Sequence, residues 1–438
     1  MNYEHIKAAV AAAAGRLGAE AWEIDIDSQE SAAAEALKDE ISTVSYSLAG
    51  NMTVRCVVGG KSGYAGSQLV TAQEAEALTE QAYANALAVD EADPIGLFAG
   101  SERYETAEEQ AAPLPSAEEL KERALQLQRL TYAADEQVVD GTQCGVSGLR
   151  LRNALINSKG LDLNYETSLV YRVVQAGLKV AGEAVDSFAV RPDGDRTDEA
   201  LAKEAVHAAL AKAGAGEVDS GKYRVILNKE CVRNLLSTFS SVFSARSAYL
   251  KTTLLVGKEG QSVAAPCVTL LDDPFHPQKF DRCPYDGEGV AAATKAVIEG
   301  GVLKTLLYNR LYADLMGAQT TGNSAGGKQI APKGLHFAPG KLSEEALLAR
   351  LGSGLYITSL QGLHAGANTQ SGDFSLQAEG FLVVDGKKTG AVKNFTVADN
   401  FFRLLQKIEA VADAVEFGAG SSYGGTELLI PEVSISGK

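Results

Sequence analysis

Short runs in which apolar and polar residues alternate constrain the fold of this chain more than any other feature. In residues 22–26 (WEIDI) every second residue is apolar. The same pattern begins at residue 149 and resumes at 161, after the turn-forming sequence NSKG at 157–160. Alternation of this kind is typical of a strand with one buried and one solvated face, and two such runs around a short polar turn predict a hairpin. We therefore expect hairpin-built sheet in the first half of the chain.

Helices are expected between these strands. The patterns T-x-x-E at 71–74 and S-x-x-E at 116–119 are capping boxes, which mark helix starts. Residues 401–415 repeat apolar side chains at helical spacing, which predicts one long helix capped by Asp399 or Asn400, with these apolar residues in the core. Strands and helices that are mixed in this way predict the α+β class.

Composition shifts divide the chain into three parts. The acidic stretch 89–116 contains three prolines, and residues 214–221 are rich in glycine, so both are expected to be connections. The sequence predicts a small N-terminal α/β domain over 1–112, a middle region of hairpins and a helix over 113–220, and a large β-rich C-terminal domain over 221–438.

Charge and length exclude several classes of protein. With 40 basic and 56 acidic residues the formal net charge is −16, which disfavours binding to nucleic acid or to anionic membranes. No stretch approaches the roughly 20 apolar residues of a membrane span, and the first residues do not resemble a secretory leader. Five scattered cysteines fit a reducing compartment, so a cytoplasmic protein is expected.

Contiguous metal motifs are absent from the sequence. No two of the five histidines lie within one helical turn, and there is no C-x-x-C pair, so any zinc site would need ligands from distant segments. His276 and Cys283 lie among Asp272, Asp273 and Asp281. This cluster permits a Cys/His nucleophile or a metal site, but a solvated acidic loop is the favoured interpretation, since a reactive thiolate needs positive surroundings.

Three further motifs resemble catalytic or ligand-binding sites, and none establishes catalysis. Residues 322–329 (GNSAGGKQ) nearly match a phosphate-binding loop, but glutamine stands where the hydroxyl should be, so a glycine-rich turn is favoured. Residues 364–375 place a His, a Ser and an Asp close together without a nucleophile elbow, which favours a strand–turn–strand. The sequence DGEG at 286–289 permits a cation or amine site, but a tight solvated turn is the simpler interpretation.

Several segments taken together resemble the TldD/PmbA family, once labelled modulators of DNA gyrase and now treated as metallopeptidases. These segments are 280–290 (FDRCPYDGEGV), 300–303 (GGVL), 320–323 (TTGN), 371–375 (SGDFS) and 394–400 (NFTVADN). One branch of the family carries H-E-x-x-x-H after a Leu-Leu pair, with a cysteine near the C-terminus. Here Ser237, Thr238 and Val242 occupy those positions, and residues 418–425 contain no cysteine. The sequence thus resembles the other branch, PmbA/TldE.

The resemblance implies a subunit with no catalytic residue and no metal ligand of its own. It would pair with a zinc-bearing TldD-type subunit and enclose a chamber in which unfolded peptides, bound by strand addition, are cut. Six residues of the resembling motifs are expected to line this chamber: Asp286, Glu288, Asn323, His364, Ser371 and Asp373.

Two alternatives stay open. The first is a self-sufficient hydrolase whose ligands come from distant residues such as His276, Cys283 and His364. The second is a peptide-binding homodimer without proteolysis, because a large apolar patch is seldom left uncovered when a partner is absent. The acidic charge gives no support to a role on DNA.

Overall fold

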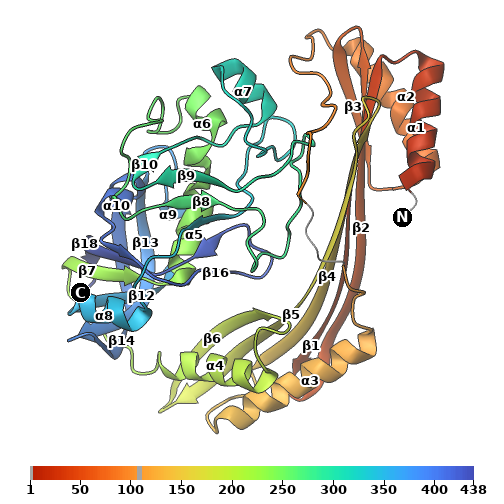
Figure 1. Cartoon of the computed structure of the whole chain (residues 1–438). Coiled ribbons are helices and arrows are strands. Elements are labelled where there is room, and N and C mark those ends of the chain that lie inside the picture. The colour runs from red at the N-terminus through yellow and green to blue at the C-terminus, as the bar shows by residue number, and fades with distance from the viewer. Residues whose placement is uncertain (1–2, 106–110) are drawn as a thin grey trace.

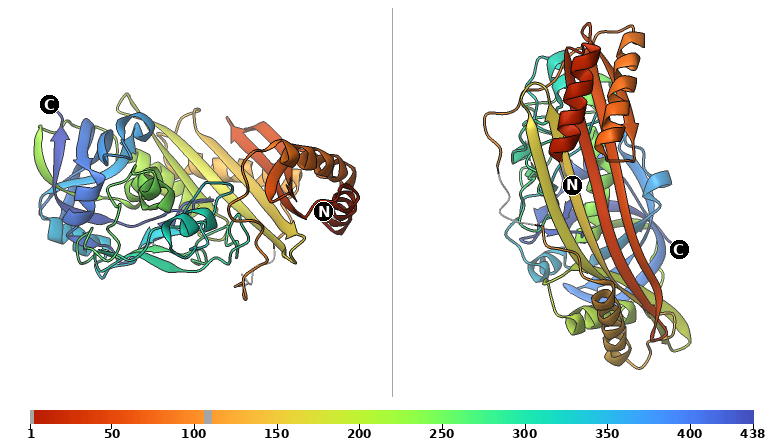
Figure 2. Two further views of the ribbon diagram at one scale, coloured as in Figure 1. Left: turned by 90° about the horizontal axis from the view of Figure 1, so that it is seen from above. Right: turned by 90° about the vertical axis from the view of Figure 1, so that its right-hand side faces the viewer.

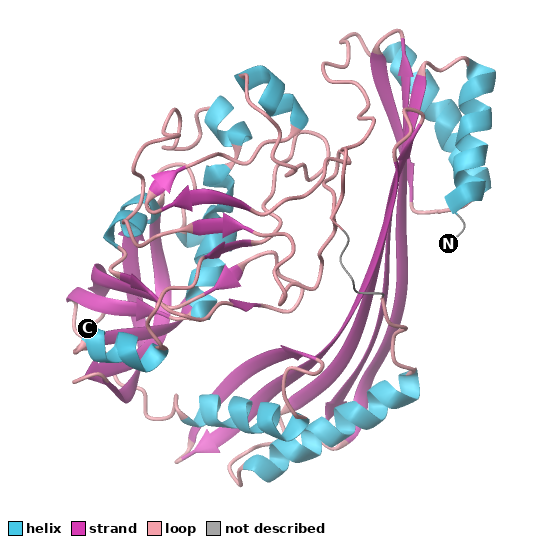
Figure 3. Cartoon of the chain, in the orientation of Figure 1, coloured by secondary structure: helices cyan, strands magenta, loops and turns pink. Residues whose placement is uncertain are grey.

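A computed structural model describes residues 3–105 and 111–438. Its two halves differ in architecture (Figures 1 and 3): a long curved sheet flanked by helices, and a compact domain of short strands and helices beside it. This arrangement confirms the α+β class. Among the described residues, no helix is long and apolar enough to cross a membrane.

The curved sheet contains six antiparallel strands in the order β3-β2-β1-β4-β5-β6. Their bounds are β1 Ala21–Leu37, β2 Glu40–Val58, β3 Lys61–Ser67, β4 Gln143–Asn157, β5 Asp162–Val180 and β6 Glu183–Pro192. The predicted hairpin is confirmed, since β4 and β5 pair around the turn at 157–160. Because β1 pairs with β4, the sheet joins strands from both sides of residue 112; the domain boundaries at 112 and 220 stay predictions.

Four helices cover the two ends of one face of this sheet. They are α1 Tyr3–Leu17 and α2 Ala72–Ala88 at one end, and α3 Ala117–Ala134 and α4 Asp198–Leu210 at the other. Both predicted helix starts are confirmed: Thr71 accepts a hydrogen bond from the N–H of Glu74, and Ser116 forms a complete capping box with Glu119. Burial of the alternating apolar positions, such as Ile24 and Ile26 against α1 and α2, fixes which face these helices cover.

The C-terminal half is built on a small barrel. The strands are β7 Gly221–Leu227, β12 Gly354–Gln361, β13 Asp373–Val384, β14 Lys387–Asn400 and β18 Leu428–Ser436, with the short β15 Ala410–Val411 at the edge. They pair in the order β14-β13-β12-β7-β18, and a further pairing of β14 with β18 closes the ring. The helix α5, Lys229–Phe239, packs in the core, where the ring of Phe239 stacks on Phe401 with centroids 4.6 Å apart.

Smaller elements complete this half of the chain. A second sheet has the order β10-β9-β8-β11 and lies beside the barrel (Figure 1). The remaining elements are β8 Leu270–Asp272, β9 Lys295–Glu299, β10 Val302–Leu303, β11 Leu335–Phe337, β16 Glu416–Phe417, β17 Gly424–Gly425, the 3-10 turn Ser240–Phe243, α6 Ala245–Tyr249, α7 Arg310–Met316, α8 Glu344–Leu351, α9 Leu363–Gly366 and α10 Phe401–Lys407. The loops between these strands carry most of the motifs.

The prediction of one helix over residues 401–415 is wrong. The helix α10 starts at the Asn400 cap, as expected, but ends at Lys407. Ile408 turns into an extended conformation with ψ 119°, and β15 pairs with β18. The apolar residues of this segment are buried in the core all the same. The pairing of β15 with β18 therefore decides the backbone conformation after Lys407, although the apolar residues of the segment have helical spacing.

Candidate functional site

The segment 280–290 joins the C-terminal domain to the curved sheet. The N–H of Arg282 donates to the hydroxyl of Tyr165 at 2.8 Å, and the hydroxyl of Tyr285 donates to the carbonyl of Asn153 at 3.3 Å. Tyr285 also packs with Leu155 and Leu161 in a small apolar cluster. The longest of the family-like motifs therefore lies at the contact between the two halves of the molecule. We call this contact of residues 280–290 with the curved sheet the seam.

Asp286 holds this segment in shape. Its side chain is 2% exposed. One carboxylate oxygen accepts the N–H groups of Glu288 and Val290 at 2.9 and 3.0 Å, and the other accepts the N–H of Ser324 at 2.8 Å. Burial raises the pKa of Asp286, while the three backbone donors oppose that rise. A tight turn is present, as expected, and its Gly287 is exposed, but the interpretation as a solvated turn is wrong for Asp286, which is buried and bonded within the turn.

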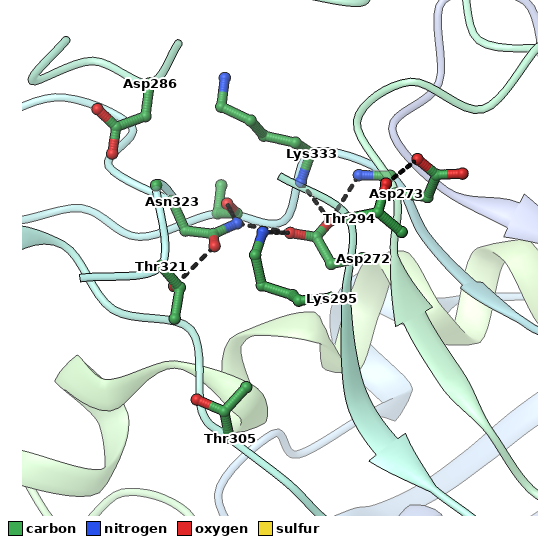
Figure 4. Close-up of polar contacts among 12 residues, drawn as sticks. Asp272, Asp273, Asp286, Thr294, Lys295, Thr305, Thr321, Asn323 and Lys333 are labelled. Atoms are coloured by element: carbon green, nitrogen blue, oxygen red, sulfur yellow. Dashed lines mark hydrogen bonds and ion pairs between the residues drawn. The ribbon is translucent and has the colours of Figure 1, made fainter. Parts of the chain in front are cut away.

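Asn323 and Asp272 form a second buried node (Figure 4). The Asn323 amide donates to Asp272 at 2.7 Å, and Lys295 lies 3.1 Å from the same oxygen. The other oxygen of Asp272 accepts the N–H groups of Lys333 and Gly334, each at 2.7 Å. Burial alone would raise the pKa of Asp272, but Lys295 and these donors lower it overall. Asp272 is fully buried, so the sequence interpretation of its surroundings as a solvated loop is wrong at this residue.

Residues 322–329, which nearly match a phosphate-binding loop, are bonded to the segment that contains Asp286. The N–H of Ser324 is taken by Asp286, and its carbonyl accepts the N–H of Gly287 at 2.9 Å. A Cβ at Gly287 would lie 2.8 Å from the backbone nitrogen of Gly326, so only glycine allows this approach. Residues 322–329 form the predicted glycine-rich turn, and its backbone packs against the 286–290 segment.

Glu288 connects the seam to α7. Its carboxylate accepts the N–H of Arg310 at 2.9 Å, while the Arg310 guanidinium donates to the carbonyls of Ile95 and Gly96 at 2.8 and 3.1 Å. Burial raises the pKa of Glu288 to about 7; the N–H of Arg310 opposes the rise and the charge of Asp286 adds to it. The connection after α2 and the C-terminal domain thus meet at Arg310, whose backbone N–H is bonded to a carboxyl group with a pKa near neutral pH.

The wild type is expected to lose unfolding free energy as the pH rises to neutral, and Glu288→Gln is expected to lose less. The folded-state pKa of about 7 lies above the ordinary 4.5, so protonation stabilises the folded state, and this contribution is lost as the pH rises through that window. Relative to the variant, the wild type should lose about 1–2 kcal/mol of unfolding free energy between pH 4.5 and 8, less than the full shift implies because solvent reaches the group. Urea unfolding of both proteins across this range measures it, and parallel pH profiles would contradict it.

His364, Ser371 and Asp373 lie elsewhere, where α9 leads into β13. The Asn400 amide donates to the carbonyl of Ser371 at 2.7 Å and to the carboxylate of Asp373 at 2.8 Å. Hydrogen bonds from Asn400 and Ser371 lower the pKa of Asp373. His364 is exposed, and among the described residues no hydrogen bond links it to Ser371. The predicted strand–turn–strand is present, with Gly372 at φ 84°, and no triad is assembled.

The structure brings His276 and His336 together, although their spacing in the sequence does not predict a contact. The ring of His276 lies 5.1 Å from that of His336, and both rings lie against Phe417. Cys283 does not join them; it packs near Tyr285, and burial raises the pKa of its thiol to about 11. Over residues 3–105 and 111–438, no three His, Cys, Asp or Glu side chains are placed to hold a metal ion.

The positions that the resemblance assigns to metal ligands lie at the end of α5 and in the 3-10 turn after it. The hydroxyl of Thr238 donates to the carbonyl of Asn234 one turn earlier, at 2.8 Å, and the carbonyl of Ser237 accepts from Ser240 at 3.1 Å. Val242 is 1% exposed in the core. A serine, a threonine whose hydroxyl is bonded within its own helix and an aliphatic side chain do not fit a zinc ion, which binds imidazole, thiolate or carboxylate.

Comparisons with known proteins agree with this fold. The crystal structure of a candidate modulator of a DNA gyrase from Thermotoga maritima superposes with a TM-score of 0.88 and 26% identity, covering 99% of this chain and 100% of that one. TldE from Thermococcus kodakarensis superposes with the same TM-score over the same shares at 22% identity, which shows a shared fold.

Curated relatives carry metalloprotease names. The metalloprotease PmbA homolog of Haemophilus influenzae is 25% identical over 321 residues, 72% of this chain and 69% of the relative. Metalloprotease PmbA of Escherichia coli O157:H7 is 26% identical over 245 residues, 56% of this chain and 52% of the relative. The aligned region thus spans between about half and about two thirds of these relatives.

Two family models divide most of the chain between them. The PmbA/TldA metallopeptidase central domain matches residues 112–213, and the PmbA/TldA metallopeptidase C-terminal domain matches residues 220–437. The chain belongs to the TldD/PmbA (PmbA/TldA) metallopeptidase family.

Proposed function

We propose that the chain is the metal-free, PmbA/TldE-type subunit of a two-subunit peptidase that acts on unfolded peptides. The observation that carries this proposal is the chemistry at the end of α5. Where the TldD branch has two histidines and a glutamate, this chain has Ser237, Val242 and Thr238. These side chains supply neither a metal ligand nor the general base of a metallopeptidase. The zinc would belong to a TldD-type partner.

In this proposal the six chamber residues have two different roles. Asp286, Glu288 and Asn323 are positioning residues, because their polar atoms are engaged by backbone and neighbouring side chains of the seam. His364, Ser371 and Asp373 lie on the α9–β13 turn, where His364 and Asp373 are exposed. We assign the contacts with peptide to this second group. A chamber of this kind, and the scattered free cysteines, support a cytoplasmic location.

Reconstitution tests the proposal. Cleavage of an unfolded peptide should require both this chain and a metal-bearing TldD-type protein, and chelation of zinc should abolish it. Each protein alone and the chelated mixture are the controls. Cleavage by this chain alone, at a rate that the partner does not change, would contradict the proposal.

The second candidate is a self-sufficient hydrolase with ligands from distant residues. The pair His276–His336, with ring centroids 5.1 Å apart, is the observation in its favour, since two imidazoles are common zinc ligands. Stoichiometric zinc that is lost on His276→Ala or on His364→Ala would favour it. Peptide binding without turnover, even with a partner present, would instead support the third candidate, a binding homodimer.

A further inference from the structure

Lys279 is a buried lysine whose ammonium group has no partner. The residue is 4% exposed, and within the part of the chain that the structure describes its side chain forms no hydrogen bond and no ion pair. The other buried Asp, Glu, Lys and Arg residues of that part are Arg172, Asp272, Asp286 and Glu427. Each of these four has an ion pair or a hydrogen bond. Because a buried charge without a partner costs stability, Lys279 is the exception that needs an explanation.

The chain around Lys279 holds its side chain in one place. The N–H of Lys279 donates to the carbonyl of His276 at 2.9 Å, and its carbonyl accepts from Nε of Arg282 at 3.1 Å. Its stem lies against Gly334, where a Cβ would be 3.1 Å from Cδ of the lysine. The nitrogen is not one of the fully enclosed polar atoms, so the small exposed part of the residue includes the ammonium. A lysine that merely snorkels leaves its whole head in water, which is not the case here.

The charged groups around Lys279 do not serve as its partner. Asp281, Asp272, Lys333 and Asp273 act on its charge from a distance. The three aspartates already accept hydrogen bonds from backbone N–H groups. Burial lowers the pKa of Lys279, and Asp281 and Asp272 oppose that change. The ammonium thus keeps its N–H donors unused, beside carboxylates that are bonded elsewhere.

This balance of charge favours an uncharged oxygen as the missing acceptor. A carboxylate or phosphate ligand would add negative charge beside the three aspartates, whereas an amide carbonyl adds none. Lys333 provides an example of the same contact within the structure, because its ammonium donates to the carbonyl of Tyr285 at 2.8 Å. Lys279 offers an equivalent donor to which no carbonyl is bound. An amide carbonyl from outside the chain would complete it.

We propose that Lys279 donates a hydrogen bond to a backbone carbonyl of the bound peptide and so anchors that peptide. Lys279 directly precedes the seam, where the carbonyl of Phe280 accepts from the hydroxyl of Thr167 in β5 at 3.2 Å. On the other side, Gln278 accepts the N–H of Phe417 at 3.1 Å. The lysine therefore lies where the C-terminal domain meets the curved sheet. Every peptide unit has a carbonyl, so this contact requires no particular side chain, as unfolded peptides of varied sequence demand.

Peptide affinity of Lys279→Met tests this inference, which rests on the proposed function. Methionine keeps an unbranched stem and removes the charge and the donors. The probe is a fluorescent unfolded peptide without acidic residues and with an amidated C-terminus. It is titrated with the full chain, alone and together with a TldD-type protein under zinc chelation, so that cleavage cannot interfere. Fluorescence anisotropy should show a Kd about 10-fold higher or more for the variant, as loss of one hydrogen bond to a charged group implies.

Stability separates a binding role from a structural one. Removal of an unpartnered buried charge should leave the midpoint of urea unfolding unchanged or raise it, whereas loss of a structural lysine lowers it. The matched control is Lys341→Met, at an exposed lysine of the same half of the chain. It should change neither the Kd nor the midpoint.

The contrary results are distinct. Wild-type affinity in Lys279→Met, a lowered unfolding midpoint for that variant, or an equal loss of affinity in Lys341→Met would overturn the inference. Weakened binding that is confined to peptides with a free carboxylate would replace the carbonyl by an acid and also overturn it. If the wild type binds and reconstitution gives cleavage while Lys279→Met matches the wild type, only this inference fails. If the wild type binds no peptide under either condition, the proposed function fails with it.

Discussion

Asp272→Ala is expected to lower the unfolding free energy by about 3–5 kcal/mol, the usual cost of removing one partner from a buried ion pair. The fully buried carboxylate accepts hydrogen bonds from two backbone N–H groups and the Asn323 amide, and it pairs with Lys295. Its removal leaves Lys295 without this partner and the backbone donors unsatisfied in a region that water does not reach. The midpoint of urea unfolding measures the loss.

The neighbouring carboxylate provides the control for this variant. Asp273 accepts from the hydroxyl of Thr294 at 2.7 Å and from the N–H of Phe275 at 3.0 Å, but it is only half-buried. Asp273→Ala should cost about 1 kcal/mol. Equal losses for the two variants would show that Asp272 is not the central group of the node. Asp272→Asn should recover only part of the loss, since it keeps the shape of the side chain without its charge.

Gly334→Ala is expected to destabilise the protein by about 3 kcal/mol or more. A Cβ at Gly334 would lie 1.8 Å from the carbonyl oxygen of Asp273 and 2.5 Å from the carbonyl carbon. Both are backbone atoms beside the pairing of β11 with β8, so no side-chain rotation can relieve the overlap. The strands must separate, which also disturbs the Gly334 N–H that Asp272 accepts.

Gly141→Ala is the matched control, because a Cβ at Gly141 meets nothing within 4 Å. This variant should change the unfolding free energy by less than about 1 kcal/mol. Thermal melts of the two variants beside the wild type separate a local clash from the general effect of adding a methyl group. A Gly334→Ala protein with the melting temperature of the wild type would contradict the close approach of β8 and β11.

Local patterns in the sequence predicted local structure well. The caps at Thr71 and Ser116 act within four residues, and the 157–160 turn joins strands that are adjacent in the chain, so the sequence alone specifies them. The helix over 401–415 failed because β15 is held by β18, whose residues come later in the chain. Helical spacing identified the buried residues there but not their backbone conformation.

The candidate site was less accessible to sequence reasoning, since its contacts are non-local. Asp286 and Ser324 are 38 positions apart, and Asp272 and Asn323 are 51 apart. The DGEG motif therefore resembles a solvated turn in the sequence, although its segment contacts residues of the curved sheet that lie more than a hundred positions earlier (Figure 2). His336 had no neighbour in sequence to mark it as the partner of His276.

The zinc content of this chain tests the proposal that a partner subunit supplies the catalytic metal. Elemental analysis should use protein purified without a metal-affinity tag and dialysed against metal-free buffer. We expect close to zero zinc per chain, together with cleavage that appears only when a metal-bearing partner is added. One zinc per chain, retained through dialysis and lost on His276→Ala, would show a metal site in this chain, and the self-sufficient hydrolase would become the leading candidate.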